Sequence, residues 1–303
     1  MSTPTLSIVI PTIGRNVLDN TIESVLQQSQ LPDEFLIWDN SGDGSAKKKS
    51  KYTNHPAIKW FIAEYRKPIV DSWNTAVDLS TGDFIYILGD DDLLFPDFVE
   101  KVRDELALGT RLIHAEEILI DSNDTPLLEQ PLCNVEKEML SSEEFVKRYS
   151  EGRYIIFLGS LVFPRKEFNL INKFKSFTMN ALSMDTLLNI ELLSEITNIT
   201  VISPPIWKYR IESANWSGKL KNSSDIQLLL QQHLEYRDYV IKYFSGHLSK
   251  YWKTFYRRWI VSSMTKVCYH TSRWRTILLI FHKHLQFKER LYILRDIFYL
   301  LRH

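Results

Sequence analysis

Short apolar runs alternate with helical patterns through the first third of the chain. Four short, mainly apolar segments are typical of strands, and they cover residues 6–10, 34–38, 58–62 and 84–88. Apolar residues recur at helical spacing in three other segments, which cover residues 16–28, 70–79 and 96–108. This alternation predicts a Rossmann-like α/β fold, in which helices flank a mostly parallel central sheet.

The pattern is less regular in the middle of the chain. Further strands are expected at residues 112–120, 155–163, 199–202 and 206–210. Ser141 and Glu144 form a capping box that opens a short helix, and a largely buried helix follows Asp185. From about residue 225 the pattern is almost wholly helical. We therefore predict an α/β domain over residues 1–218 and an α-helical C-terminal region over residues 219–303.

Three consecutive carboxylates, Asp90, Asp91 and Asp92, follow the fourth apolar run. Adjacent acids repel one another, and a hard divalent cation such as Mg²⁺ or Mn²⁺ removes that cost because it prefers oxygen ligands. Ligands of open α/β sheets bind outside the carboxyl ends of the strands, where these acids should lie. The alternative is a helix N-terminus decorated with acids that complement the helix dipole.

A second acid, Asp39, ends the second predicted strand. The following Asn-Ser-Gly-Asp-Gly sequence imitates the start of a calcium-binding loop, but the twelfth position is Ser50 rather than glutamate, which excludes that motif. An acid at a strand tip can accept hydrogen bonds from a ribose hydroxyl or a base N–H. The alternative is a plain Asx-turn.

Other chemistries find little support in the sequence. It has no Ser-His-Asp order and no His-Glu-x-x-His motif, and Cys133 and Cys268 are too far apart for a metal-ligand motif. No signal peptide is visible, and no apolar stretch reaches the roughly 18 residues that a membrane span needs. We expect a cytoplasmic protein, with the inner face of the cell membrane as a candidate place of attachment.

The C-terminal region combines basic and aromatic residues. From His247 onward the sequence has twelve Lys or Arg residues and only two acidic residues, Glu289 and Asp296, although the formal net charge of the whole chain is zero. This composition is typical of amphipathic helices that lie at an anionic membrane interface. The alternatives are a helical subdomain that packs on the α/β domain or on another subunit, and, less favoured by the apolar pattern, nucleic-acid binding. We expect peripheral membrane contact and no nucleic acid, with the oligomeric state open.

Five motifs in this order resemble family 2 glycosyltransferases. They are the strand followed by Pro11-Thr12-x-x-Arg15, the segment from Trp38 to Gly44, Asn74 in a helix, Gly82-Asp83-Phe84-Ile85, and the acids at 90–92. The resemblance covers Leu6 to about Gly218 and implies the GT-A fold and a nucleotide-diphospho-sugar donor.

The resemblance also implies roles for individual residues. Donor binding is expected from Pro11, Thr12, Arg15, Asp39, Ser41, Asn74, Asp90, Asp91 and Arg210. The metal, Mn²⁺ or Mg²⁺, is expected on Asp92 and Asp91, with Glu212 as a further ligand. Three positions depart from the family pattern: Gly89 replaces its frequent first acid, Trp73 replaces an arginine, and Glu212 replaces a histidine.

Asp185 resembles the family's general base, which deprotonates the acceptor hydroxyl. The implied function is therefore an inverting, metal-dependent transfer of a sugar from a nucleotide diphosphate, UDP by family habit, to a glycan or polyprenyl-linked acceptor. Surface polysaccharide synthesis is the expected context. The alternative is a non-catalytic nucleotide-sugar-binding or membrane-attached scaffold with the same fold.

Overall fold

The computed structural model describes residues 3–127, 137–154, 156–175 and 184–211, together with Glu235, Asp238, Tyr239 and Tyr251. The chain divides into two units, and the sheet lies in the first, which comprises Met1–Phe145 and Tyr154–Glu212. The second comprises Val146–Arg153 and Ser213–His303. Apart from the four single residues, the predicted helical region 219–303 lies outside the described residues, so the domain boundary after residue 218 stays a prediction.

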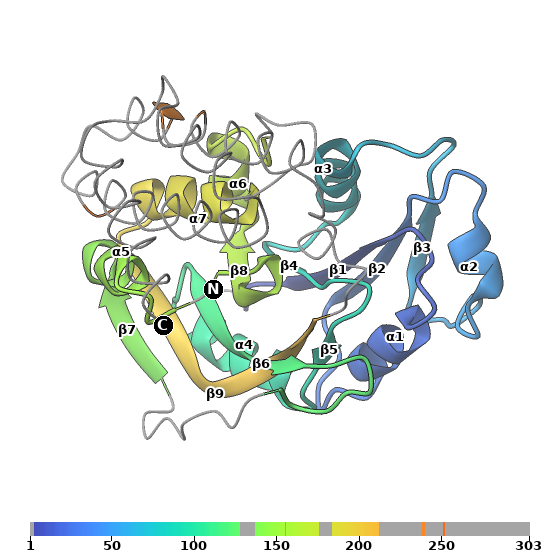
Figure 1. Cartoon of the computed structure of the whole chain (residues 1–303), viewed down its shortest axis with the longest axis horizontal. Helices are drawn as coiled ribbons and strands as arrows, with labels where there is room; N and C mark the ends of the chain where they lie inside the picture. Colours follow the sequence, from blue (N-terminus) through green and yellow to red (C-terminus); the bar gives the residue numbers. More distant parts are fainter. Residues whose placement is uncertain are drawn as a thin grey trace, which may run out of the picture. The chain divides into compact units, whose positions relative to one another are not determined.

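One mixed sheet forms the centre of the first unit (Figure 1). Its strands within the described ranges are β1 (Leu6–Thr12), β2 (Glu34–Asp39), β3 (Lys59–Ile62), β4 (Phe84–Ile87), β5 (Leu93–Leu94), β6 (Ile113–Ile120), β7 (Lys137–Ser141), β8 (Leu161–Pro164) and β9 (Asn198–Arg210). Their order is β3-β2-β1-β4-β8-β6-β9-β5, with β7 also paired to β9. Strands β3, β2, β1 and β4 are parallel neighbours, and β9 is parallel to β6. The predicted α/β fold with a mostly parallel sheet is confirmed.

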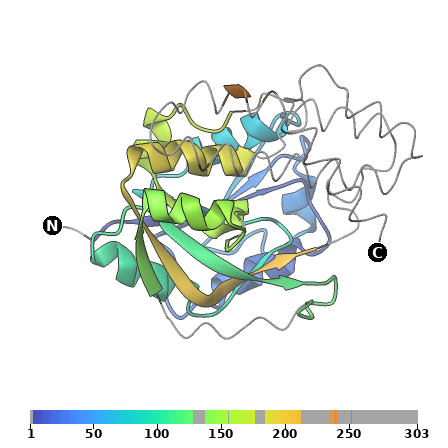
Figure 2. The same ribbon diagram turned by 60° about the vertical axis from the view of Figure 1, so that its left-hand side comes forward.

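Helices separate the strands along the chain. Their bounds are α1 (Leu18–Leu26), α2 (Ser45–Lys49), α3 (Ile69–Leu79), α4 (Phe98–Ala107), α5 (Ser142–Ser150), α6 (Arg165–Leu170) and α7 (Met184–Glu195), with a 3₁₀ turn at Leu158–Ser160. The predicted apolar face of α1 is buried, with Leu18, Ile22 and Val25 at most 3% exposed. Figure 2 shows α7, in yellow, leading into the long strand β9. Among the described residues, no helix has both the length and the apolar character that a bilayer span requires.

The strands beside the candidate site are buried on both faces. Leu6, Ile8 and Ile10 of β1 are fully buried and belong to one core with residues of α1 and α4. Continuous apolar runs are expected where helices cover both faces of a parallel sheet. This burial explains why β1, β2 and β4 could be predicted from mainly apolar segments, whereas β3 is more exposed.

The later strands differ from the prediction in two places. The strand expected over 155–163 is shortened to β8 by the 3₁₀ turn, in which the Phe157 N–H donates to Ser160 Oγ (3.1 Å) and a Cβ added at Gly159 would lie only 2.6 Å from the Trp207 ring. The two strands expected around Pro204 are one strand, β9, whose register with β6 shifts between Ala115 and Glu117. The sequence patterns also missed α2, α6, β5 and β7.

Candidate functional site

The polar residues predicted at the strand tips lie at one edge of the sheet. β1 lies between β2 and β4, and Thr12 is the register partner of Asp39 across the β1–β2 pair. The Asn40 N–H donates to the Thr12 carbonyl (2.8 Å), which joins the two tips directly beyond Pro11. Asp90 extends the group from the end of β4, since its carboxylate accepts a hydrogen bond from Thr12 Oγ1 (2.7 Å).

Arg15 neutralises two of the three consecutive acids. Its Nε lies 3.2 Å from Asp90 Oδ1, and its Nη1 pairs with Asp91 Oδ2. Gly14, with φ +87°, turns the chain after β1, and its N–H donates to Thr12 Oγ1 (2.9 Å). Burial raises the pKa of Asp90, which the bonds from Thr12 and Arg15 partly oppose.

Asp92 is the most deeply placed acid of the cluster. It is 4% exposed, and the backbone N–H of Arg210 donates to its Oδ1 (2.9 Å). Burial, followed by the charge of Asp91, raises the pKa of Asp92 well above its ordinary value. A cation that met both carboxylates would remove this penalty.

Gly89 shapes the space in front of these two carboxylates. A Cβ added at Gly89 would lie 2.5 Å from Asp92 Oδ2 and 3.3 Å from Asp91 Oδ1. Two carboxylate oxygens thus approach one backbone position that carries no side chain. This geometry explains why this chain has glycine where the resemblance leads one to expect an acid.

The carboxylate oxygens of Asp91 and Asp92 are the kind of ligand that a magnesium or manganese ion prefers. Within the described ranges no three His, Cys, Asp or Glu side chains form a ready metal group. Mg²⁺ in phosphate-transfer sites commonly takes one or two carboxylates and completes its shell with water and substrate phosphates. Asp91 and Asp92 supply such a pair, whereas Glu212, the predicted further ligand, lies outside the described residues.

Asp39 is fully buried and organises the loop that follows β2. Its Oδ1 accepts the N–H of Ser41 (3.0 Å), and its Oδ2 accepts the N–H of Lys47 (2.9 Å). Ser41 Oγ in turn accepts the N–H of Ser45 (3.1 Å). This is the Asx-turn that sequence reasoning held as the alternative. A carboxylate has further lone pairs, so a donor contact at Asp39 stays a prediction.

Arg210 is 1% exposed and is surrounded by partners. Its Nε donates to the Asp91 carbonyl (2.7 Å), its Nη1 to the Asp121 carbonyl (2.9 Å), and its Nη2 to the Asp124 carboxylate. At least three of the five guanidinium N–H groups are thus engaged, and the side chain is too deeply buried for a diphosphate to reach it in this conformation. The contacts give Arg210 a structural role, and the predicted donor contact would require a rearrangement.

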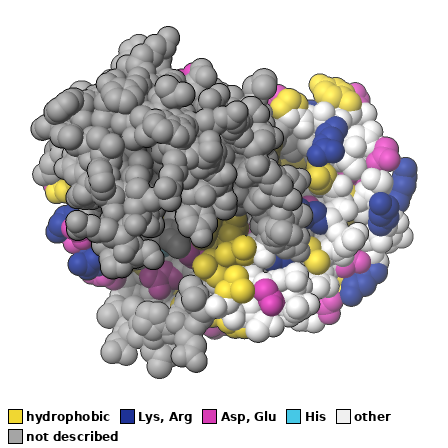
Figure 3. Space-filling view, in the orientation of Figure 1, with side chains coloured by type: hydrophobic (Ala, Val, Ile, Leu, Met, Phe, Trp, Pro, Cys, Tyr) yellow, Lys and Arg dark blue, Asp and Glu magenta, His cyan; other side chains and the backbone are white. Residues whose placement is uncertain are grey.

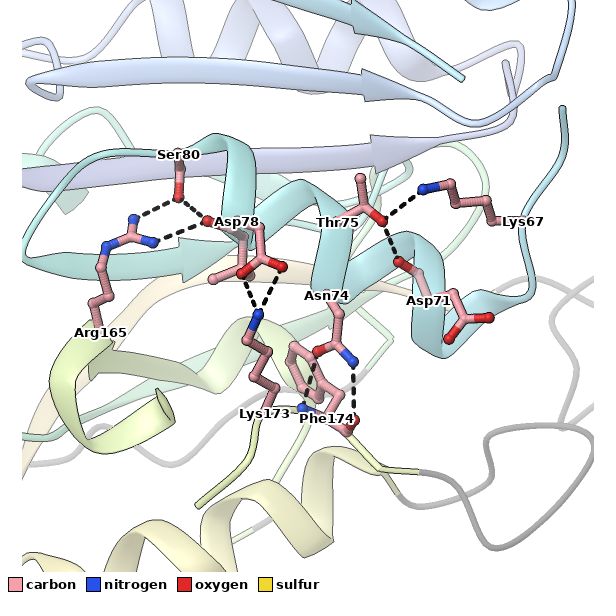
Figure 4. A network of polar contacts seen from close by, with 10 residues as sticks. Lys67, Asp71, Asn74, Thr75, Asp78, Ser80, Arg165, Lys173 and Phe174 are labelled. Carbon is pink, nitrogen blue, oxygen red and sulfur yellow. Dashed lines mark hydrogen bonds and ion pairs between the residues drawn. The ribbon is translucent and has the colours of Figure 1, made fainter. Parts of the chain in front are cut away.

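Asn74 also has its polar atoms engaged. Figure 4 shows its side-chain amide paired with the backbone of Phe174, with both N···O distances at 3.0 Å. Phe174 follows α6 and lies 100 positions further along the chain. The structure therefore connects Asn74 to the segment between α6 and α7, and it connects none of the described strand-tip acids to Asn74 by a hydrogen bond.

Asp185 lies in the first turn of α7, as predicted. The Thr186 N–H donates to its Oδ1 (2.7 Å), and burial raises the pKa of Asp185 to about 6. A carboxylate with this pKa is ionised at neutral pH and is a stronger base than an exposed aspartate.

Tyr209 connects the acid cluster with Asp185 and was missed by sequence reasoning. Its ring stacks on Phe157 with centroids 3.9 Å apart. Burial, followed by the charges of Asp92, Asp91 and Asp185, raises its pKa. Tyr209 therefore lies within electrostatic reach of both predicted functional groups. Its position immediately before Arg210 was the available signal.

Known proteins are similar to this chain in sequence and in fold. Residues 7–130 match the family model described as glycosyl transferase family 2. This segment, which is less than half of the chain, is therefore similar to family 2 glycosyltransferases. The match includes Thr12, Asp39 and the three acids after β4, so it covers the strand tips described above.

Three curated proteins are similar to parts of this chain. Chondroitin synthase of Escherichia coli is 35% identical over 34% of this chain and 15% of its own length. The uncharacterized glycosyltransferase YwdF of Bacillus subtilis is 31% identical over 38% of this chain and 42% of its own length. A Campylobacter jejuni protein named GalNAc(5)-diNAcBac-PP-undecaprenol beta-1,3-glucosyltransferase is 23% identical over 55% of each chain. The chain therefore spans less than two thirds of the length of each of these relatives.

Solved structures of S. aureus TarS resemble the chain over a longer stretch. TarS 1-349 in complex with UDP-GlcNAc aligns with a TM-score of 0.60 over 96% of this chain and 79% of that one, at 11% identity. TarS 1-349 in complex with UDP gives the same score over 94% and 77%. At this identity the likeness shows the fold, which is the predicted GT-A fold.

Proposed function

We propose that this glycosyltransferase moves a sugar from a UDP-sugar to a hydroxyl group of a glycan or lipid-linked glycan, with inversion and with a divalent metal. The observation that carries the proposal is the placement of Thr12, Asp39 and three consecutive acids at one edge of the sheet, inside the segment that matches the family model. Carboxylates at that edge suit a metal-bound diphosphate.

The comparisons support the choice of substrates. TarS structures contain UDP-GlcNAc or UDP, which favours a uridine nucleotide for this chain. The Campylobacter relative is named for a glycan linked to undecaprenol, which favours a lipid-linked acceptor for this chain. A cytoplasmic location at the inner face of the membrane, with peripheral contact through the C-terminal region, agrees with such an acceptor.

The chemistry is a single displacement. The acceptor oxygen bonds to the anomeric carbon while the bond from that carbon to the diphosphate oxygen breaks, and the leaving diphosphate takes the electron pair. The acceptor proton passes to the carboxylate of Asp185. When Mg²⁺ or Mn²⁺ is bound, Asp91 and Asp92 would hold it, and its charge would stabilise the diphosphate. Arg15, already paired with the acids, is placed to contribute a second positive charge.

The test compares Asp185→Asn with Glu195→Gln. Both variants convert a carboxylate to an amide in α7, and Glu195 is exposed at its far end. With UDP-GlcNAc and other UDP-sugars as donors, Asp185→Asn should lose at least about a hundredfold in transfer rate while it still binds UDP with Mn²⁺. Glu195→Gln should behave as wild type. A near-normal rate in Asp185→Asn would refute the role of the base, and a wild type that binds donor but transfers no sugar would be the scaffold alternative.

The pH dependence gives an independent check. Because burial raises the pKa of Asp185 to about 6, its protonated form accumulates below that pH and cannot accept the acceptor proton. kcat/KM should therefore fall below about pH 6 with the pH dependence of a single protonation. A profile that stays flat down to pH 5 would contradict the assignment.

A further inference from the structure

The side chain of Asn74 fixes a distant backbone segment. Its Nδ2 donates to the Phe174 carbonyl and its Oδ1 accepts the Phe174 N–H, each at 3.0 Å (Figure 4). Two simultaneous hydrogen bonds to one residue determine orientation as well as distance. The Phe174 side chain is 3% exposed, and its ring meets those of Trp73 (5.6 Å between centroids) and Phe168 (5.2 Å).

Further contacts attach α6 and the turn after it to α3. Arg165 donates to the Val77 carbonyl (3.0 Å) and to Ser80 Oγ (2.7 Å), and Lys173 Nζ lies 2.6 Å from the Asp78 carboxylate (Figure 4). Two consecutive non-glycine residues, Asn172 and Lys173, have φ of 61° and 64°. Such left-handed residues turn the chain sharply, and they persist where surrounding contacts compensate for their cost. Here the turn returns Phe174 to α3.

The same segment is joined to the helix that carries Asp185. Lys175 Nζ lies 2.7 Å from Glu191 Oε1, and their side chains are 25% and 8% exposed. Glu191 and Asp185 both belong to α7. A continuous series of contacts thus runs from Asn74 through Phe174 and Lys175 to α7.

The other part of α3 is connected to the strand-tip edge. The Asn40 side chain pairs with both the N–H (2.9 Å) and the carbonyl (3.0 Å) of Lys67. Lys67 Nζ then donates to Thr75 Oγ1 (3.0 Å), beside Asn74 in the sequence. Since Asn40 directly follows Asp39, α3 links the tip of β2 with the segment that holds α7.

We propose that Asn74 is a positioning residue, which sets the place of Asp185 through α7 and makes no contact with the donor. The inference rests on the proposed function for the role of Asp185. A base displaced by about 1 Å costs on the order of a hundredfold in rate. Loss of the Asn74 amide should therefore lower kcat about ten- to a hundredfold and leave the affinity for UDP with Mn²⁺ unchanged.

The experiment uses two disrupting variants and one control in the full-length protein. Asn74→Leu keeps the side-chain volume and removes both hydrogen bonds, and Lys175→Met removes the contact with Glu191. The control, Asp78→Asn, removes the exposed ion pair of the same helix with Lys173, whose side chains are 50% and 36% exposed. Such exposed pairs contribute little. The three readouts are kcat, calorimetric affinity for UDP with Mn²⁺, and hydrogen exchange of amides 184–195.

The proposal expects both disrupting variants to lower kcat at unchanged UDP affinity and to exchange the α7 amides at least about tenfold faster, while Asp78→Asn resembles wild type. Weaker UDP binding at unchanged kcat in Asn74→Leu would overturn it in favour of a donor contact. Unchanged exchange in α7 would overturn it as well. A wild-type protein without transfer activity would refute the proposed function alone, because the exchange readout needs no turnover. If Asn74→Leu fails to fold, Lys175→Met decides by the same criteria.

Discussion

Replacing Arg210 by methionine separates a structural role from a donor contact. Methionine keeps much of the buried stem and removes the guanidinium, which donates to the carbonyls of Asp91 and Asp121 and to the Asp124 side chain. The backbone N–H of residue 210 still reaches Asp92 Oδ1. The variant therefore tests the guanidinium alone.

The expected loss of stability follows from these three partners. Loss of the hydrogen bond to the buried Asp91 carbonyl lowers the free energy of unfolding by about 1–3 kcal/mol. Loss of the bond to the part-buried Asp121 carbonyl lowers it by less. Asp124 is 43% exposed in its side chain and regains water, so it adds little. A total of about 3 kcal/mol corresponds to a Tm lowered by roughly 6–12 °C, at about 2–4 °C per kcal/mol for a domain of this size.

The measurement is thermal unfolding followed by circular dichroism with no nucleotide present. Arg103→Met is the control, because Arg103 pairs with Asp33 in a part-exposed ion pair (2.9 Å) and should shift Tm by no more than about 2 °C. If Arg210→Met unfolds at the wild-type temperature and yet binds UDP at least tenfold more weakly, the structural interpretation is refuted and the donor contact predicted from the sequence is supported.

Three further predictions concern the surroundings of the acids. Gly89→Ala should weaken binding of UDP with Mn²⁺ at least about fivefold, because its Cβ would lie 2.5 Å from Asp92 Oδ2 and overpacking costs about 1–3 kcal/mol. Tyr209→Phe should keep the stack on Phe157 and lower kcat about tenfold, since the hydroxyl lies near the acids. The stability of the wild type relative to Glu117→Gln should fall as pH rises from about 4.5 to about 8: burial raises the pKa of Glu117 in the folded state, so unfolding releases a proton across this window.

Each of these predictions has a control. Gly109→Ala costs backbone strain at φ +88°, but the added Cβ meets no atom within 4 Å, so it should leave UDP affinity unchanged; an equal loss of affinity in both glycine variants would contradict the clash. Tyr65→Phe removes the hydroxyl of a residue that is 65% exposed, and its kcat should equal that of wild type. For Glu117, equal pH–stability curves for wild type and variant, measured by urea unfolding, would be inconsistent with the raised pKa.

The first half of the fold could be predicted because its elements are regular and locally determined. β1, β2 and β4 are buried on both faces, so each appears as a mainly apolar segment. The later elements depend on partners distant in sequence. Gly159 packs against Trp207, and β5 has only two residues that pair with β9, so neither leaves a local pattern.

The candidate site shows the same division. The positions of Thr12, Asp39 and the acids follow from strand ends, which the sequence indicates. The bonding of Asn74 and Arg210 could not be predicted, because their partners, Phe174 and Asp121, lie 100 and 89 positions away. A polar side chain in a matching motif can form a hydrogen bond with a ligand or with the protein backbone. The fold determines which of the two it contacts.

The long strand β9 has a consequence for how the protein can be divided. The family-matching segment ends at residue 130, but the N–H that secures Asp92 and the guanidinium that secures the Asp91 carbonyl both come from residue 210. A truncated protein that stopped at the end of the match would contain every acid of the cluster and lack the strand that braces it. During synthesis, the acids can therefore form these contacts only after residue 210, the last residue of β9, has emerged from the ribosome.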